Sequence, residues 1–190
     1  FKQKTAYEIM PSLVCSEMCI RDSDNIDFKS FWKESEYINK VCTGENLTDE
    51  MVQEAEKRLG VKLPKSYIDL MKTQNGGKPN KNVWFDEKNR YRVDLEEFYS
   101  ISEKKEDSIF GKFGNEFWYD EWEYPRNVGV IIADTISGGH EMIYLDYRDC
   151  GKDGEPKVSI CIQEDDFEII VLASNFEEFI LGLRASEEIK

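Results

Sequence analysis

The chain has 190 residues, 40% of them hydrophobic and 34% charged, with a formal net charge of −14 and a single histidine. A chain of this length suits one domain and buries about 70% of its unfolded surface. The electrostatic field of such a negative protein repels nucleic acid and anionic membranes and attracts basic proteins. We therefore expect a protein partner, and we expect binding to neither nucleic acid nor a membrane. The same acidity is typical of proteins selected only for solubility, and composition leaves both explanations open.

The five cysteines are odd in number and irregularly spaced, which does not indicate a secreted disulfide framework. The sequence has no run of about 18 apolar residues, so no membrane-spanning helix is predicted. The simplest expectation from these two observations is a cytoplasmic protein.

Residues 1–23 differ in character from the rest of the chain. Acidic residues interrupt any hydrophobic stretch that a signal peptide would need, and Cys15 and Cys19 lack the second Cys/His pair of a zinc site. The run YEIMPSLVCSEMCIRDS resembles a translated sequencing adapter, so we expect residues 1–23 to have no evolved function and the domain to span residues 24–190. The segment holds three basic and three acidic residues, and the domain alone therefore keeps the charge of −14.

Three helices are predicted in the first part of the domain. Apolar residues from Asp27 to Val41 fall near a helical period, which predicts a helix packed on the domain. Thr48 suits the N-cap of a second helix, and Gly60 suits its end because glycine adopts the left-handed conformation cheaply. Pro64 suits the first turn of a third helix, where its missing N–H loses nothing.

The third predicted helix turns Tyr67, Leu70 and Met71 inward, and it stops at Asn75-Gly76-Gly77. The ordered combination of Leu59-Gly60, Leu63-Pro64, Tyr67 and Asn75-Gly76-Gly77 resembles the signature of the SUKH superfamily, the Smi/Knr-type domain. The resemblance covers residues 47–183. It implies an immunity protein of the bacterial kind, which binds and neutralises a toxin domain that is often a nuclease. Fungal relatives, by the same resemblance, act as cell-wall regulators.

The second part of the domain reads as a sheet closed by a helix. A hairpin is predicted from Val83–Phe85 and Tyr91–Val93, with a turn at Asp86–Asn89. Further apolar runs predict strands at Val128–Ala133, Met142–Tyr147, Val158–Ile162 and Phe167–Leu172, the first two joined by Ser137-Gly138-Gly139. Ser174 and Glu177 form a capping box for a last helix with an apolar stripe at Phe176, Phe179, Ile180 and Leu183. We predict a single α+β domain, with helices packed on a mainly antiparallel twisted sheet.

The segment FGNEFWYDEWEY, residues 113–124, has the most unusual composition in the chain, because large aromatic residues alternate with acids. One interpretation is an amphipathic helix whose aromatic face is buried, as large aromatics usually are. The other is a binding segment, since Trp and Tyr dominate the energetic centres of protein interfaces. Both hold if different faces of the segment serve the two purposes.

The sequence offers little for catalysis. His140 follows a Gly-Gly turn, where a solvated turn residue is the default, and any Ser-His-Asp or Cys-His arrangement would have to use it. No phosphate-binding loop, dinucleotide fingerprint or nucleophile elbow is present. The acids Asp134, Asp146, Asp149, Asp153 and Glu164-Asp165-Asp166 lack the spacing of a Ca²⁺ loop. We therefore predict no enzyme, no cofactor and no metal.

The resulting hypothesis is toxin immunity by binding, with a basic nuclease domain as partner. We expect acids to steer the encounter and aromatics to anchor the bound state. The predicted contact residues are Trp118, Tyr119, Asp120, Glu121, Trp122, Glu123, Asp134 and His140. This choice follows from composition and not from a family motif. The rival hypotheses are a regulatory scaffold of the fungal type and a small hydrolase that works through paired carboxylates.

Overall fold

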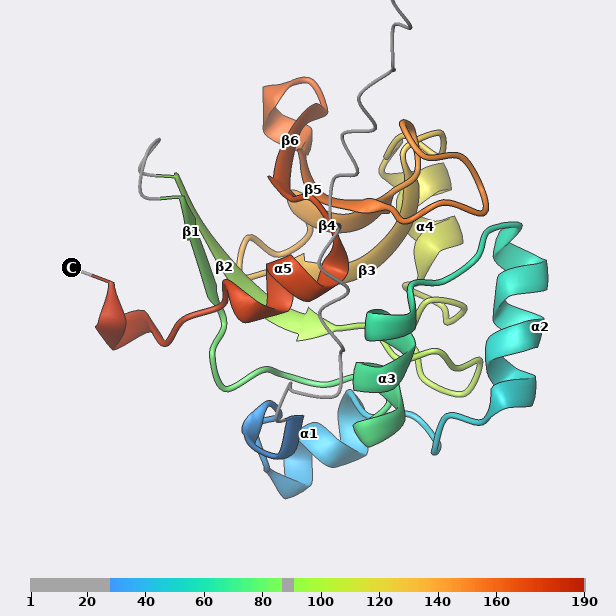
Figure 1. Cartoon of the computed structure of the whole chain (residues 1–190), viewed down its shortest axis with the longest axis vertical. Helices are drawn as coiled ribbons and strands as arrows, with labels where there is room; N and C mark the ends of the chain where they lie inside the picture. The colour runs from blue at the N-terminus through green and yellow to red at the C-terminus, as the bar shows by residue number, and fades with distance from the viewer. Residues whose placement is uncertain (1–27, 87–90, 190) are drawn as a thin grey trace, which may run out of the picture.

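The computed structural model describes residues 28–86 and 91–189, and these form a six-stranded antiparallel sheet (Figure 1). The strands lie in chain order, so each pairs with its sequence neighbour. They are β1 Val83–Asp86, β2 Tyr91–Phe98, β3 Gly129–Thr135, β4 Glu141–Asp146, β5 Lys157–Ile162 and β6 Glu168–Ala173. After β6 the chain returns to β1, where Val83 and Arg184 exchange two backbone hydrogen bonds of 3.0 and 2.8 Å. The predicted α+β fold with a mainly antiparallel sheet is confirmed.

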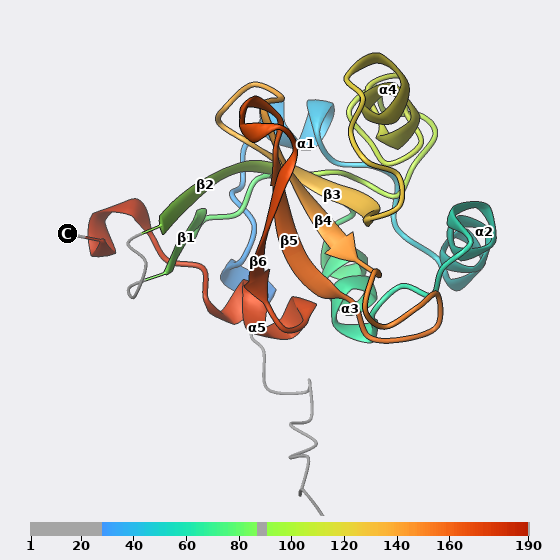
Figure 2. The same cartoon turned by 90° about the horizontal axis from the view of Figure 1, so that it is seen from above.

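Helices cover both faces of this sheet. They are α1 Glu36–Val41, α2 Asp49–Leu59, α3 Lys65–Thr73, α4 Asn115–Glu121 and α5 Phe176–Leu181, with short 3₁₀ segments η2 Phe28–Ser30, η3 Gln163–Asp165 and η4 Ser186–Glu188. Figure 2 shows α3 and α5 on one side of the sheet and α4 on the other. Tyr67 of α3 and Phe176 of α5 meet edge-to-face, with ring centroids 5.1 Å apart. Among the described helices, none is both long and apolar enough to cross a membrane.

The ends of α2 are set by the residues that mark them in the sequence. The Thr48 hydroxyl accepts a hydrogen bond from the Met51 N–H at 3.3 Å, which satisfies one orphan donor of the first turn. Gly60 ends the helix with φ of 72°. The polar residue on its inner face, Glu56, accepts a bond of 3.0 Å from the Leu63 N–H and so fixes the corner that leads to α3.

Asn75 ties the exit of α3 to two distant segments. Its buried amide Nδ2 donates to the carbonyls of Glu45 at 2.8 Å and Ile101 at 3.1 Å, and its Oδ1 accepts from the Ile101 N–H at 2.8 Å. Gly76 follows with φ of 87°, and a Cβ there would lie 2.7 Å from the backbone nitrogen of Ser100. The Asn-Gly-Gly run is therefore an architectural joint, because the Asn75 amide satisfies three backbone groups and the absence of a Cβ at Gly76 allows the close approach of Ser100.

The predicted helix from Asp27 to Val41 is wrong as one element. Asp27 lies outside the described residues, and the rest divides into η2 and α1 with an extended stretch between them. In that stretch Trp32 bridges Pro79, and the Lys33 N–H donates to the Lys78 carbonyl at 2.8 Å. These backbone bonds to a distant segment replace the helical ones, so tertiary contacts override the local periodicity.

The cap of the last helix lies one residue later than the predicted Ser174–Glu177 box. Asn175 is the N-cap, and its side chain accepts from the Glu178 N–H at 2.8 Å. The Glu178 carboxylate accepts a bond of 3.4 Å from the Ser174 N–H. Two side-chain bonds therefore cap the start of this helix, as in a capping box, but one residue later than predicted. The predicted turn at residues 87–89 and the prediction for residues 1–23 lie outside the described residues.

Candidate functional site

Three segments that are far apart in the sequence meet at one end of the sheet. They are the C-terminal end of α4, the turn between β3 and β4, and η3. The Trp122 ring packs edge-on against the His140 ring at 5.6 Å. His140 Nδ1 lies 3.1 Å from Gln163 Oε1, and the Gln163 N–H donates to the His140 carbonyl at 2.9 Å. His140 therefore links all three segments.

Buried aromatic residues hold this convergence in place. The Tyr124 hydroxyl donates to the Gly139 carbonyl at 2.7 Å, and the Tyr124 ring contacts the Phe167 ring at 5.5 Å. Gly139 has φ of 103°, and a Cβ on it would lie 2.9 Å from the Trp118 ring. The Gly-Gly turn is thus needed for close approach to the indole as well as for its backbone conformation.

Five exposed acids either flank Trp122 in the sequence or belong to η3 and its C-cap, and we name these acids, with Trp122 and His140, the acidic end. They are Glu121, Glu123, Glu164, Asp165 and Asp166. Glu164 lies 3.7 Å from His140, and none of the other four forms an ion pair with a described residue. Trp122 is partly exposed between them. The surface thus combines uncompensated negative charge with an aromatic side chain, a composition that suits a basic protein partner.

The acidic end is also where the backbone is strained. In the described part of the chain, the non-glycine residues with positive φ are Glu123 at 60°, Asp166 at 56° and Phe167 at 58°. Such conformations are uncommon for side chains larger than Asn or Asp, and they concentrate at functional sites. Glu123 follows the end of α4, at a position that glycine usually fills. Keeping an acid there costs stability, which points to a role beyond folding.

Replacing Glu123 with glycine is therefore expected to raise the free energy of unfolding by about 0.5–1 kcal/mol, because glycine adopts the left-handed conformation without a Cβ clash. The measurement is urea unfolding followed by tryptophan fluorescence. Glu121→Gly is the matched control, since it removes an exposed acid from helical backbone and is expected to lower stability by about 0.5–1 kcal/mol. A loss of stability in Glu123→Gly would contradict the strain assignment.

Three of the predicted contact residues serve the fold or are neutralised within it. Trp118 is 8% exposed and packs its ring against Trp122 at 5.3 Å. The Tyr119 hydroxyl lies 2.7 Å from the Gly129 carbonyl, which ties α4 to β3. Asp120 pairs with Arg126 at 2.5 Å. The predicted aromatic inner face of α4 is therefore confirmed. Of the acids that point outward, Glu116 and Asp120 form ion pairs with Arg126, and Glu121 and Glu123 belong to the acidic end.

Asp134 lies away from the acidic end and faces β2. The Glu97 N–H donates to Asp134 Oδ1 at 3.1 Å, and the two residues are register partners between β2 and β3. Burial, and next the nearby Glu97 carboxylate, raise the pKa of Asp134 to about 8. Burial also raises the pKa of Glu97, whose residue is 8% exposed. Two adjacent carboxyl groups in a shielded place thus hold protons at pH values where exposed acids have lost them.

Asp134→Asn is expected to stabilise the protein by about 1–3 kcal/mol at pH 8.5 and to bring no gain at pH 4. The unfolded Asp134 ionises near pH 4, whereas the folded group keeps its proton until about pH 8, so native stability falls as pH rises between these values. The asparagine oxygen retains the bond from the Glu97 N–H. The check is thermal unfolding at both pH values, with the exposed Asp153→Asn as a control expected to change stability by less than about 0.5 kcal/mol. An equal gain at both pH values would refute the titration of Asp134 as the cause.

Sequence reasoning grouped Trp122, Glu121, Glu123 and His140, and the structure brings the Trp122 and His140 rings into contact. Sequence reasoning missed that η3 reaches His140 through Gln163 and Glu164. No local pattern signals that meeting, because it depends on strand register. Of the other acids considered for cations, Asp146 is held by Arg148 at 2.6 Å and by the Ser159 hydroxyl at 2.8 Å. Throughout the described residues, no three of His, Cys, Asp and Glu are grouped as a metal ion would require.

Comparison with known families identifies one match. The model of the SMI1 / KNR4 family (SUKH-1) matches residues 46–182, which is well over half of the chain. No curated protein matches the sequence. The matched range begins just before α2 and ends just after α5, so it contains the whole sheet, the Asn75 joint and the acidic end. This chain belongs to the SMI1 / KNR4 family (SUKH-1).

Proposed function

We propose that the protein is an immunity protein that binds and neutralises a basic toxin domain, with a nuclease as the expected class. One observation carries the choice of surface. The acidic end carries four acids without an ion pair to a described residue, two of them beside the partly exposed Trp122 and two in or after η3, and Glu123 and Asp166 among them have positive φ. The SUKH-1 assignment of the chain is compatible with immunity and supports this proposal.

The proposed action is binding and not chemistry. A nuclease must hold phosphates and is therefore commonly basic, so an acidic surface can occupy the same groups that nucleic acid would. Stoichiometric inhibition would need an interface of about 1,600 Å² in total, which is larger than the acidic end alone. We place the neutralisation in the cytoplasm, where nucleic acid would be the target of such a toxin.

Co-expression tests the proposal directly. The full chain is produced together with the toxin encoded beside its gene, and survival is compared with cells that carry the toxin alone. We expect survival to be restored, and we expect a complex of the two proteins that dissociates more readily as salt is raised. An inactive toxin variant provides the control for survival. Death of the cells with every neighbouring toxin, together with no co-purification, would reject the immunity function.

A further inference from the structure

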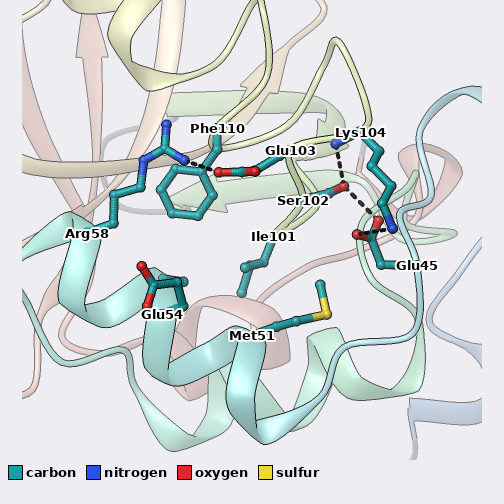
Figure 3. Close-up of a pocket in the computed structure, with 10 residues that line it drawn as sticks. Glu45, Met51, Glu54, Arg58, Ile101, Ser102, Glu103, Lys104 and Phe110 are labelled. Atoms are coloured by element: carbon teal, nitrogen blue, oxygen red, sulfur yellow. Dashed lines mark hydrogen bonds and ion pairs between the residues drawn. The ribbon is translucent and has the colours of Figure 1, made fainter.

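A cavity of about 240 Å³ lies between α2 and the segment of residues 101–110. Met51 and Ala55 line it from α2, and Ile101 and Phe110 line it from the opposite segment. Figure 3 shows Met51, Ile101 and Phe110 together with the charged side chains of Arg58 and Glu103 on one side and of Lys104 and Glu45 on the other. The floor of the cavity is apolar and its rim is charged.

Four of the rim charges pair with one another. Arg58 Nη1 lies 2.5 Å from Glu103 Oε1, and its guanidinium lies 4.3 Å from the Phe110 ring centroid. At the other side, Lys104 Nζ lies 3.2 Å from Glu45 Oε1. Because these groups form pairs, a ligand needs no charge of its own to satisfy them. The paired charges at the rim therefore restrict entry to the cavity by the shape of the ligand and not by its charge.

Glu54 is the rim acid with the weakest partner. Its side chain is 71% exposed, and its carboxylate lies 3.7 Å from Lys57 in a pair between neighbouring turns of α2. Glu54 lines the cavity, and Figure 3 shows it on α2 between Arg58 and Met51. An exposed pair of this kind contributes little to stability, so its carboxylate is available to a cation on a partner.

The cavity belongs to the frame of the fold. Asn75 binds the backbone of Glu45 and of Ile101, which stand on the rim and on the floor. Ser102 adds a bond of 2.7 Å from its hydroxyl to Glu45 Oε2. These bonds fix Glu45 relative to residues 101–102, and Arg58 of α2 joins the opposite wall through Glu103 and the Phe110 ring. A pocket formed before a ligand arrives binds with less loss of conformational entropy.

The size of the cavity decides the class of ligand. Pockets for cofactors and drug-sized molecules enclose about 300–1,000 Å³, and this cavity of about 240 Å³ lies below that range, which favours a smaller group. A single side chain fits an apolar hollow of this size, as in the centres of protein interfaces. Methionine and phenylalanine in its wall favour contact with an aromatic ring.

We propose that this cavity receives one bulky aromatic side chain from a protein partner, and that a basic residue next to it in the partner pairs with Glu54. The site is separate from the acidic end and gives the surface an apolar anchor. The inference rests on the proposed function only where the partner is taken to be the toxin. Its test needs no toxin, so failure of immunity and failure of this site are distinguishable.

The test uses short peptides as probes of the full chain. Acetyl-Phe-Arg-amide, acetyl-Phe-Glu-amide and acetyl-Gly-Arg-amide are titrated while the methyl signals of Met51 and Ile101 are followed by NMR. Met71 and Met142 are fully buried elsewhere and serve as internal controls. We expect saturable shifts of Met51 and Ile101 with the Phe-Arg peptide, at least threefold weaker binding of the Phe-Glu peptide, and no saturation with the Gly-Arg peptide.

Two variants on α2 separate blocking from a change of fold. Glu54→Trp places an indole at the mouth and is expected to abolish the shifts, whereas Gln53→Trp, at a neighbouring exposed position that does not line the cavity, is expected to keep them. Glu54→Gln should remove the preference for the Phe-Arg peptide. Absence of saturation, equal response to the Gly-Arg peptide, or binding that survives Glu54→Trp would overturn the site. A charge preference that survives Glu54→Gln would overturn the role of Glu54.

Discussion

Asn75→Ala is expected to destabilise the protein by about 3–5 kcal/mol, a large part of the 5–15 kcal/mol that usually holds a domain together. The substitution removes three hydrogen bonds at once and leaves the Ile101 N–H and the carbonyls of Glu45 and Ile101 without their partner. Each unsatisfied buried group costs about 1–3 kcal/mol. Chemical unfolding followed by tryptophan fluorescence measures the loss.

Asn80→Ala is the matched control for this prediction. Asn80 also donates its side-chain amide to two backbone carbonyls, those of Ser30 and Trp32, at 2.8 and 2.9 Å, but it is exposed. Water can replace these bonds, so the expected loss is about 1 kcal/mol or less. Similar losses for the two variants would show that Asn75 is not the joint described above.

Reversal of charge at the acidic end is expected to slow association with the basic toxin that we propose as partner at least about tenfold at low salt. The variant changes Glu121, Glu123 and Asp165 to lysine, three exposed acids without an ion pair to a described residue. Like charges then face the basic toxin during the encounter, and the remaining association rate should depend less on salt. Stopped-flow measurement of the association rate at two salt concentrations gives both quantities.

The control is the same reversal at Glu34, Glu36 and Glu187, three exposed acids in other segments of the chain. It changes the net charge by the same amount, so any general effect of charge appears in both variants. We expect this second variant to retain most of the association rate. If the two variants slow association equally, the total charge of the protein steers the encounter and the acidic end has no special role.

Much of the fold is predictable because its boundaries carry local chemistry. Thr48 and Gly60 mark α2 by groups that act within a few residues, and the predicted ends of that helix are the observed ones. The hydrophobic periodicity predicted a helix wrongly where the backbone bonds to a distant segment. At Trp32 the neighbouring residues form backbone hydrogen bonds with residues 78–80 in place of helical ones. Local signals cannot reveal a competitor that lies more than 40 residues away.

The candidate site is less predictable for the same reason. The sequence shows that acids stand on both sides of Trp122. It does not show which of these acids form ion pairs in the folded protein. Asp120 is neutralised by Arg126 across the turn after α4, while η3 reaches His140 only because β4 and β5 align. The raised pKa of Asp134 comes from its burial and next from its register partner Glu97. These properties come from strand pairing, which a single sequence does not encode in adjacent residues.

The return of the chain to β1 also bears on how the domain completes itself during synthesis. Because the strands pair in chain order, each new strand can join the one made just before it. The bonds between Val83 and Arg184 are different, since they link residues 101 positions apart and cannot form until Arg184 has left the ribosome. Until then β1 keeps an unpaired backbone edge that other chains can join. Pairing with Arg184 therefore protects the start of the β1 edge only when synthesis of the domain is almost complete.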